Sequence, residues 1–173
     1  MRSLLPVILI LLLNSCSEMK PEDYKNTKPI IKIEEYFQGN VKAWGMLQGR
    51  SGEVKRQFVA DMKGEFDGQN LILDETFIWN DGEKQERKWD IRKIDNNTYE
   101  GTASDVVGIA KGVSFGSAFK FEYKLLVPYK DKEIKIRFDD WIFKQDEKTA
   151  INKATLTKFG FKVGELTVFF LKN

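Results

Sequence analysis

The sequence predicts an all-β fold, an antiparallel sandwich or barrel of about nine or ten strands. Two observations support this prediction. From Ile30 onward, short segments of alternating apolar and polar residues are separated by Gly, Asn and Asp, a pattern typical of strands joined by tight turns. Aromatic residues make up 13% of the chain, and most occupy every second position, where one strand face would be buried.

The first predicted hairpin covers residues 41–62 and turns at residues 50–52. A three-residue turn keeps residues that share a strand face opposite one another, and Gly52 can adopt the left-handed conformation that this turn requires. In this register Trp44 lies opposite Phe58, and both side chains point toward the core.

The second predicted hairpin covers residues 71–91 and has the same kind of turn at residues 80–82. Its register places Glu75 opposite Arg87 on the apolar face of the sheet. Because two separate hairpins favour one turn type, each supports the strand assignment of the other.

Later segments continue the pattern. Residues 119–127 alternate apolar and charged side chains and predict a half-buried strand. In residues 132–143 the apolar phase changes at Asp139 and Asp140, which predicts a β-bulge. The C-terminal residues predict two more strands that turn near residues 160–164.

The N-terminus predicts a secretory signal peptide over residues 1–15. Arg2 precedes an apolar segment, Leu4–Leu13, of about ten residues, which is too short to span a bilayer of about 30 Å. The following LNSC sequence resembles the lipobox of bacterial lipoproteins. By that resemblance Cys16 is lipidated and the leader is cleaved before it, whereas an ordinary secretory leader with an incidental cysteine is the alternative.

The remaining chain divides into two parts. Residues 16–28 are polar and aperiodic, and we interpret them as a lipidated N-terminus and a tether. Residues 29–173 form one β domain. Ser17 replaces the aspartate that resembles an inner-membrane retention signal, so the expected location is the periplasmic face of the outer membrane.

Composition excludes several classes of function. The chain has no histidine, and its single cysteine is assigned to lipidation, which excludes Ser-His-Asp and Cys-His catalysis and zinc sites made of these residues. We therefore expect no catalytic residues, no cofactor and no metal, although an enzyme that uses carboxylates alone remains an alternative. A formal net charge of +2 without a long basic block argues against a nucleic-acid partner.

Several sequence segments together resemble a family of bacterial lipoproteins catalogued as domain of unknown function 3833. The resemblance spans roughly residues 36–170. The segments that carry it are FQGNVKAWG, GEVKRQF, LDETFIWNDGEKQERKW, YEGTASDVVGIAKGVSFGSAFKFEY, FDDWIF and NKATLTKFGFKVGELTVFF. The resemblance implies a periplasm-facing lipoprotein with a lipocalin-like β-barrel of about eight to ten strands, and it implies no activity or active site.

Charged residues on the predicted apolar faces are the first candidates for a site. An unpaired buried charge costs several kcal/mol, so these side chains should pair inside the barrel, either as a structural network or as contacts to the polar end of a ligand. This candidate interior cluster consists of Arg56, Glu75, Arg87, Asp105 and Asp140.

Aromatic residues are the second candidates, because a barrel of eight to ten strands can enclose one small ligand. The candidate cavity aromatics are Trp44, Phe58, Phe77, Trp89, Phe121 and Tyr123. The glycines of residues 101–116 lack a nucleotide-binding pattern, and we interpret them as places where an aromatic ring packs against the strand.

The sequence thus favours a lipoprotein, anchored to the membrane through its N-terminal lipid, that binds a small apolar or amphipathic molecule such as a lipid. The alternative is a structural or protein-docking module of the envelope with a solid core. An interior void of a few hundred Å³ favours the first function, and an exposed apolar patch favours the second.

Overall fold

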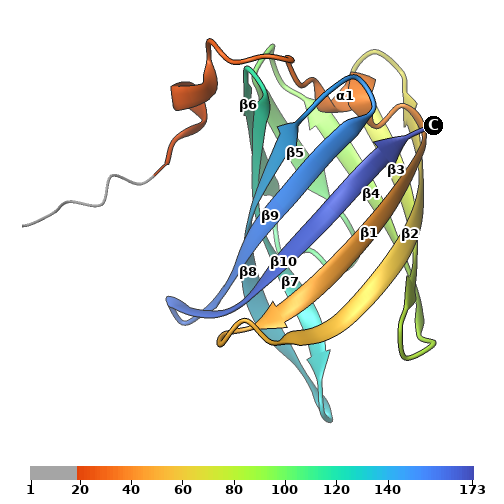
Figure 1. Cartoon of the computed structure of the whole chain (residues 1–173), viewed down its shortest axis with the longest axis vertical. Coiled ribbons are helices and arrows are strands. Elements are labelled where there is room, and N and C mark those ends of the chain that lie inside the picture. Colours follow the sequence, from red (N-terminus) through yellow and green to blue (C-terminus); the bar gives the residue numbers. More distant parts are fainter. Residues whose placement is uncertain (1–18) are drawn as a thin grey trace, which may run out of the picture.

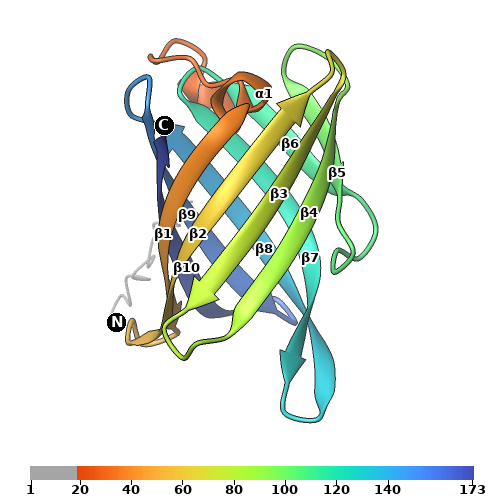
Figure 2. The ribbon, with the colours of Figure 1, turned by 90° about the vertical axis from the view of Figure 1, so that its right-hand side faces the viewer.

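The computed structural model describes residues 19–173, so the predicted signal peptide and Cys16 lie outside the described residues. Ten antiparallel strands close into one barrel in which chain neighbours pair and β1 closes on β10 (Figures 1 and 2). The strands are β1 (Gly39–Gly49), β2 (Val54–Phe66), β3 (Asn70–Trp79), β4 (Lys84–Lys93), β5 (Thr98–Thr102), β6 (Ala110–Phe115), β7 (Ala118–Tyr129), β8 (Lys132–Lys144), β9 (Thr149–Lys158) and β10 (Phe161–Lys172). The predicted all-β class, antiparallel topology and lipocalin-like barrel are confirmed.

Alternation along the strands fills the barrel interior with apolar side chains. β7 shows this most clearly, because Phe119, Phe121, Tyr123 and Leu125 are all buried, as the sequence predicts. Two glycines allow the rings to pack closely: a Cβ atom on Gly112 would lie 2.8 Å from the ring of Phe119, and one on Gly101 would lie 2.7 Å from the ring of Phe121. The close approach of an aromatic ring therefore explains both glycines.

The register of the second hairpin is confirmed. Glu75 pairs with Arg87 across β3 and β4, and Leu73 pairs with Trp89. The turn is also the predicted one, because the Trp79 amide donates to the Glu83 carbonyl over 2.9 Å and Gly82 has a φ of 87°. Glu75 and Arg87 consequently point into the barrel together.

The predicted register of the first hairpin is wrong beyond its turn. Gln48 pairs with Val54 as expected, but Leu47 then pairs with Arg56, so Lys55 is an extra residue in a β-bulge. A bulge moves every later side chain to the opposite face. Phe58 is therefore opposite Gly45 rather than Trp44, and its ring occupies the space that a side chain at Gly45 would need.

The bulge predicted at Asp139 and Asp140 is absent. β8 pairs with β7 and β9 without a register shift, so Asp140 points inward and Trp141 outward. Trp141 is nevertheless buried, because the ring of Tyr24 lies against it with centroids 6.0 Å apart. The outer face of the strand is apolar here because another segment of the chain covers it.

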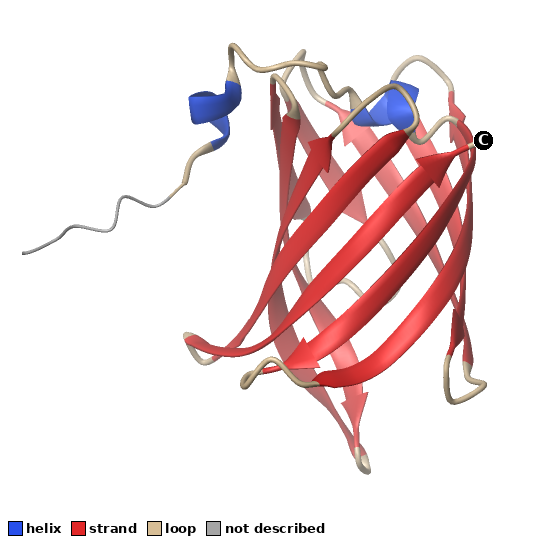
Figure 3. Ribbon diagram, viewed as in Figure 1, coloured by secondary structure: helices blue, strands red, loops and turns tan. Residues whose placement is uncertain are grey.

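Short helices precede the barrel (Figure 3). The 3-10 helix η1 (Pro21–Tyr24) belongs to the segment interpreted as a tether, but Thr27 fixes this segment to the barrel through a 2.8 Å hydrogen bond with Ser117. Helix α1 (Ile33–Tyr36) lies across one end of the barrel, opposite the β3–β4 and β7–β8 turns (Figure 1). The sequence analysis did not detect α1, because four residues are too few to show a helical period.

Helix α1 closes its end of the barrel. Ile33 and Tyr36 are buried, and the Tyr36 hydroxyl donates to the Lys148 carbonyl over 2.9 Å. No helix of residues 19–173 has the length and apolar character that crossing a bilayer requires.

Candidate functional site

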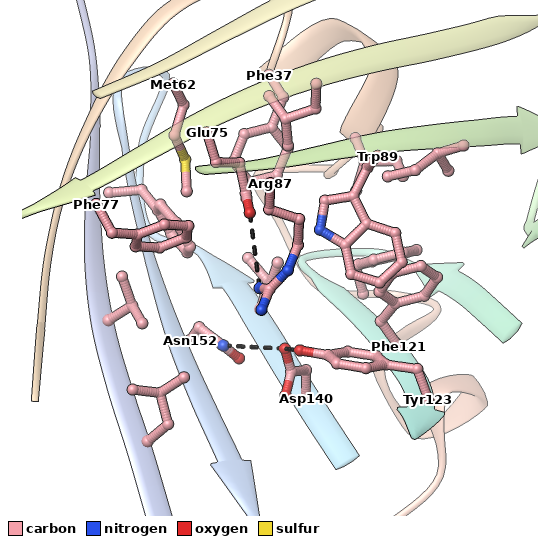
Figure 4. Close-up of a pocket in the computed structure, with 18 of the residues that line it drawn as sticks. Phe37, Met62, Glu75, Phe77, Arg87, Trp89, Phe121, Tyr123, Asp140 and Asn152 are labelled. Atoms are coloured by element: carbon pink, nitrogen blue, oxygen red, sulfur yellow. Dashed lines mark hydrogen bonds and ion pairs between the residues drawn. The ribbon is translucent and has the colours of Figure 1, made fainter. Parts of the chain in front are cut away.

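The barrel encloses a cavity of about 110 Å³ beneath α1. Its wall is mainly apolar and aromatic, with four polar side chains among the lining residues: Glu75, Arg87, Asp140 and Asn152. Figure 4 shows that these side chains point toward one another from different strands. The cavity is smaller than the few hundred Å³ expected for a ligand of drug size, so it suits a small molecule or one end of a larger one.

Arg87 binds two carboxylates. Its Nη2 atom lies 2.8 Å from Asp105 Oδ2, and its Nε atom donates to the same carboxylate over 3.0 Å. Its Nη1 atom lies 3.8 Å from Glu75 Oε2. Asp105 belongs to the β5–β6 loop (residues 103–109). This loop lies beside β7, where Val106 forms an antiparallel bridge with Leu125. The structure therefore brings three predicted cluster residues together.

Asp140 forms a second group on the opposite side of the cavity. Tyr123 donates its hydroxyl to Asp140 Oδ2 over 2.9 Å, and Asn152 Nδ2 donates to the same oxygen over 3.3 Å (Figure 4). Asp140 Oδ1 and Asn152 Oδ1 are buried and have no hydrogen-bond partner. Unpaired buried acceptors are costly, so both oxygens require a hydrogen atom from another group.

Burial shifts the titration of both interior carboxyls. Burial raises the pKa of Glu75 to about 7, although Arg87 opposes the shift. Burial likewise raises the pKa of Asp140 to about 7, against the hydrogen bonds from Tyr123 and Asn152. A proton on Asp140 Oδ1 would allow an acid–amide pair with Asn152 and satisfy both unpaired oxygens.

The prediction that Arg56 belongs to the interior cluster is wrong. Its guanidinium lies 4.1 Å from the centre of the Trp79 ring and binds Asp81 and Glu83, with Nη2 2.8 Å from Glu83 Oε2. These partners belong to the β3–β4 turn, at the barrel end away from α1. Arg56 shares the inward face of β2 with Phe58 but lies two residues nearer the start of the strand, so it belongs to the rim instead of the cavity wall.

Trp44 is likewise not a cavity residue. It is 41% exposed on the outer surface, where its ring centroid lies 6.0 Å from that of Phe169. The bulge in β2 accounts for this position. Because of the extra residue, Trp44 is opposite Val59 on the outer face, and Phe58 lies on the inner face. The other five predicted aromatics all line the cavity: Phe58, Phe77, Trp89, Phe121 and Tyr123.

Sequence reasoning missed two polar groups. Asn152 follows the inward alternation of Ala150 and Ala154 in β9, and this pattern could have revealed it. Glu34 of α1 is buried and accepts hydrogen bonds from the Tyr99 hydroxyl over 2.8 Å and from Lys93 over 2.6 Å. The sequence carries no signal for Glu34, because its burial follows from the position of α1.

The part of the chain that the structure describes contains no group of side chains suited to bind a metal ion. Within residues 19–173, no three acidic or cysteine side chains are grouped closely enough to hold a metal ion.

Replacing Asp140 with asparagine should stabilise the protein above pH 7. A buried carboxyl with a raised pKa binds more protons in the folded protein than in the unfolded chain. Its contribution to the stability of the fold is therefore fully present below about pH 4 and is lost as the pH rises to about 7. The amide keeps the shape and can pair with Asn152, so the gain should reach about 2 kcal/mol at pH 8 and vanish near pH 4. Urea unfolding at several pH values measures this difference.

The control is Asp131→Asn in the exposed β7–β8 turn, which should reproduce the wild-type pH profile. A destabilised Asp140→Asn protein at pH 8 would mean that Asp140 is held there as a fully compensated anion.

Solved structures with the same fold are distant in sequence. An S-type phycobiliprotein lyase CPES from Guillardia theta superposes with a TM-score of 0.59 at 8% identity, covering 90% of this chain and 98% of that chain. A protein of unknown function from the DUF3598 family of Nostoc punctiforme gives a TM-score of 0.62 at 12% identity, covering 84% of this chain and 51% of that one. At these identities the likeness establishes the fold alone.

No curated protein sequence matches the chain. The family described as "Protein of unknown function (DUF3833)" matches residues 10–172, which is nearly the whole chain.

Proposed function

The chain belongs to the DUF3833 family, and we propose that it binds a small amphipathic molecule inside its barrel. One observation carries this proposal: a cavity with aromatic walls contains two buried oxygens, on Asp140 and Asn152, that have no partner when Asp140 is ionised. The apolar part of the ligand would contact the aromatic rings, and its polar end would satisfy these oxygens. A purely structural barrel would gain stability by filling this space with apolar side chains.

The proposal assigns binding rather than catalysis. Carboxylate catalysis needs two carboxyls whose pKa values differ and which converge on one reacting group. Here the pKa values of Glu75 and Asp140 are both raised to about 7, and the guanidinium of Arg87 lies between the two carboxyls (Figure 4).

Native mass spectrometry of the full-length protein purified from its own membranes tests the proposal. We expect a bound molecule in the wild type and none in Val168→Phe, which fills the cavity from β10. Val163→Phe adds the same ring to an exposed position of the same strand and should retain the molecule. Wild-type protein that carries no additional mass, or Val168→Phe protein that still carries it, would contradict binding in the barrel.

Membrane attachment through a lipid on Cys16 is part of the proposal. Cys16 lies three residues before Met19, and Met19 lies over the outer face of β8, β9 and β10 beside Phe143. A lipid-bearing N-terminus would therefore hold this face within about 10 Å of the bilayer. Cys16→Ser should move the protein from the membrane to the soluble fraction, and mass spectrometry of the N-terminal peptide should detect the acyl chains.

An apolar surface that begins on this face and continues around the barrel to β3 supports contact with lipid. Six outward-facing side chains lie in register across six adjacent strands, and we call them the outer apolar row: Ile78, Val59, Trp44, Phe169, Ile151 and Phe143. Four of them, from Ile78 to Phe169, are between 36% and 49% exposed. A continuous exposed apolar surface with a tryptophan is typical of a membrane or protein contact.

Acyl chains labelled with bromine should quench the fluorescence of Trp44 in the lipidated protein. With vesicles of phosphatidylethanolamine and phosphatidylglycerol, we expect Trp44→Phe to remove most of the quenching and Trp79→Phe, inside the barrel rim, to remove little. Equal quenching in the wild type and Trp44→Phe would place the outer apolar row away from lipid. It would then favour the alternative, a protein-docking role for this face.

A further inference from the structure

We infer that the interior site selects ligands whose polar end is an ammonium group and discriminates against carboxylates of the same length. This inference rests on the proposed function of the cavity and specifies the polar end of the ligand. It follows from the charges and hydrogen-bonding groups that line the cavity.

The single basic side chain among the described lining residues is already paired with two carboxylates. Arg87 presents its Nε and Nη2 atoms to Asp105, at 3.0 and 2.8 Å. Its remaining Nη1 atom faces Glu75 at 3.8 Å. Since one guanidinium already serves two carboxylates, a ligand carboxylate would add a negative charge to a site that has no cation left to pair with it.

The unpartnered atoms are acceptors. Asp140 is 8% exposed and Asn152 3%, and the Oδ1 atom of each lacks a hydrogen-bond donor. Tyr123 cannot supply one, because its hydroxyl hydrogen already binds Asp140 Oδ2. An ammonium group has several N–H donors and no acceptor, so it matches these atoms better than a carboxylate, which has acceptors only.

Aromatic rings also surround this position. Phe77, Trp89, Phe121 and Tyr123 line the same cavity, and ring faces attract cations, most strongly where water is excluded. Arg87 already shows such a contact, with its guanidinium carbon 5.7 Å from the centre of the Phe77 ring. A carboxylate would be repelled by the same ring faces.

Binding of an ammonium group should be linked to the release of a proton from Asp140. The groups that face Asp140 are Tyr123 on β7, Asn152 on β9, Arg87 on β4 and Glu75 on β3, with Asp139 adjacent in the chain. Because the pKa of Asp140 is raised to about 7, the empty site holds a proton there for part of the time at neutral pH. An ammonium ligand favours the ionised carboxylate, so its binding should release a proton and strengthen about tenfold between pH 6 and 8.

Titration calorimetry with hexylamine, hexanol and hexanoate tests the inference on the full-length protein. These probes share one chain and differ in the polar end. At pH 8 we expect hexylamine to bind at least tenfold more tightly than hexanoate, with hexanol between them. At pH 6, where the empty site still holds a proton on Asp140, buffers of different ionisation enthalpy should reveal proton release for hexylamine alone.

Two variants and a control strengthen the test. Asp140→Asn should lower hexylamine affinity about tenfold at pH 8 and reduce its pH dependence to the part that Glu75 contributes. Glu75→Gln should also weaken hexylamine binding. Asp131→Asn, in the exposed β7–β8 turn, should behave as the wild type. The circular dichroism spectrum verifies that each variant is folded.

The outcomes separate the inference from the proposed function. Hexanoate that binds as tightly as hexylamine, or amine binding that does not change between pH 6 and 8, would overturn the selection of ammonium while leaving ligand binding intact. Failure of all three probes, together with no bound molecule in native mass spectrometry, would overturn the proposed function itself.

Discussion

Replacing Arg87 with methionine is expected to lower the free energy of unfolding by about 3–5 kcal/mol at pH 8, because it leaves buried carboxylates without a counter-charge. Methionine has a similar length and adds no new charge. Arg87 is 14% exposed, Glu75 is 8% exposed, and Asp105 makes its charged hydrogen bonds to Arg87. Urea unfolding monitored by tryptophan fluorescence measures the loss.

The loss should depend on pH. At pH 5 Glu75 and Asp140, whose pKa values are raised to about 7, carry protons, and the missing guanidinium then leaves fewer charges unbalanced. Arg92→Met is the matched control, because Arg92 lies on the outer face of the same strand and pairs with Glu100 near solvent. It should cost less than 1 kcal/mol at both pH values. Equal losses for the two variants would show that Arg87 contributes only a surface ion pair.

The Glu75–Arg87 pair shows how much of the site could be predicted from the sequence. Alternation fixed which residues share a face, and the three-residue turn at residues 80–82 fixed the register, so local rules placed both side chains inside the barrel. Asp140 could be assigned to the interior because its strand alternates, although the expected bulge beside it is absent.

Trp44 shows where local rules fail. The turn of the first hairpin is the predicted one, but the extra residue at Lys55 reverses the faces beyond it. In this register the ring of Phe58 packs against Gly45 inside the closed barrel. Such packing is a tertiary contact, and alternation along one strand cannot reveal it.

Asp105 and Tyr24 illustrate a second limit. Asp105 reaches Arg87 because its loop runs beside β7, and Tyr24 covers Trp141 because the N-terminal segment folds back on β8. Both placements depend on contacts between segments far apart in the chain. The sequence could therefore indicate that buried charges need partners, but it could not assign Asp105 to Arg87.

Helix α1 depends on one glycine of β2 for its position at the barrel end. Gly64 points inward, and a Cβ atom there would lie 2.0 Å from the Phe37 carbonyl oxygen, which directly follows α1. Gln38 then forms a bridge with Gly64. Because the obstructing atom belongs to the backbone, it cannot move aside as a flexible side chain could.

Gly64→Ala should therefore displace α1 and lower the free energy of unfolding by about 3 kcal/mol. Loss of contacts around Ile33 and Phe37, which line the cavity, should also admit water at that end of the barrel. Hydrogen exchange should accelerate for the amides of residues 33–37 more than for those of β7. Lys63→Ala alters the neighbouring outward-facing position and should leave both stability and exchange near wild-type values. If exchange in α1 remained unchanged in Gly64→Ala, the closed end of the cavity would not depend on this contact.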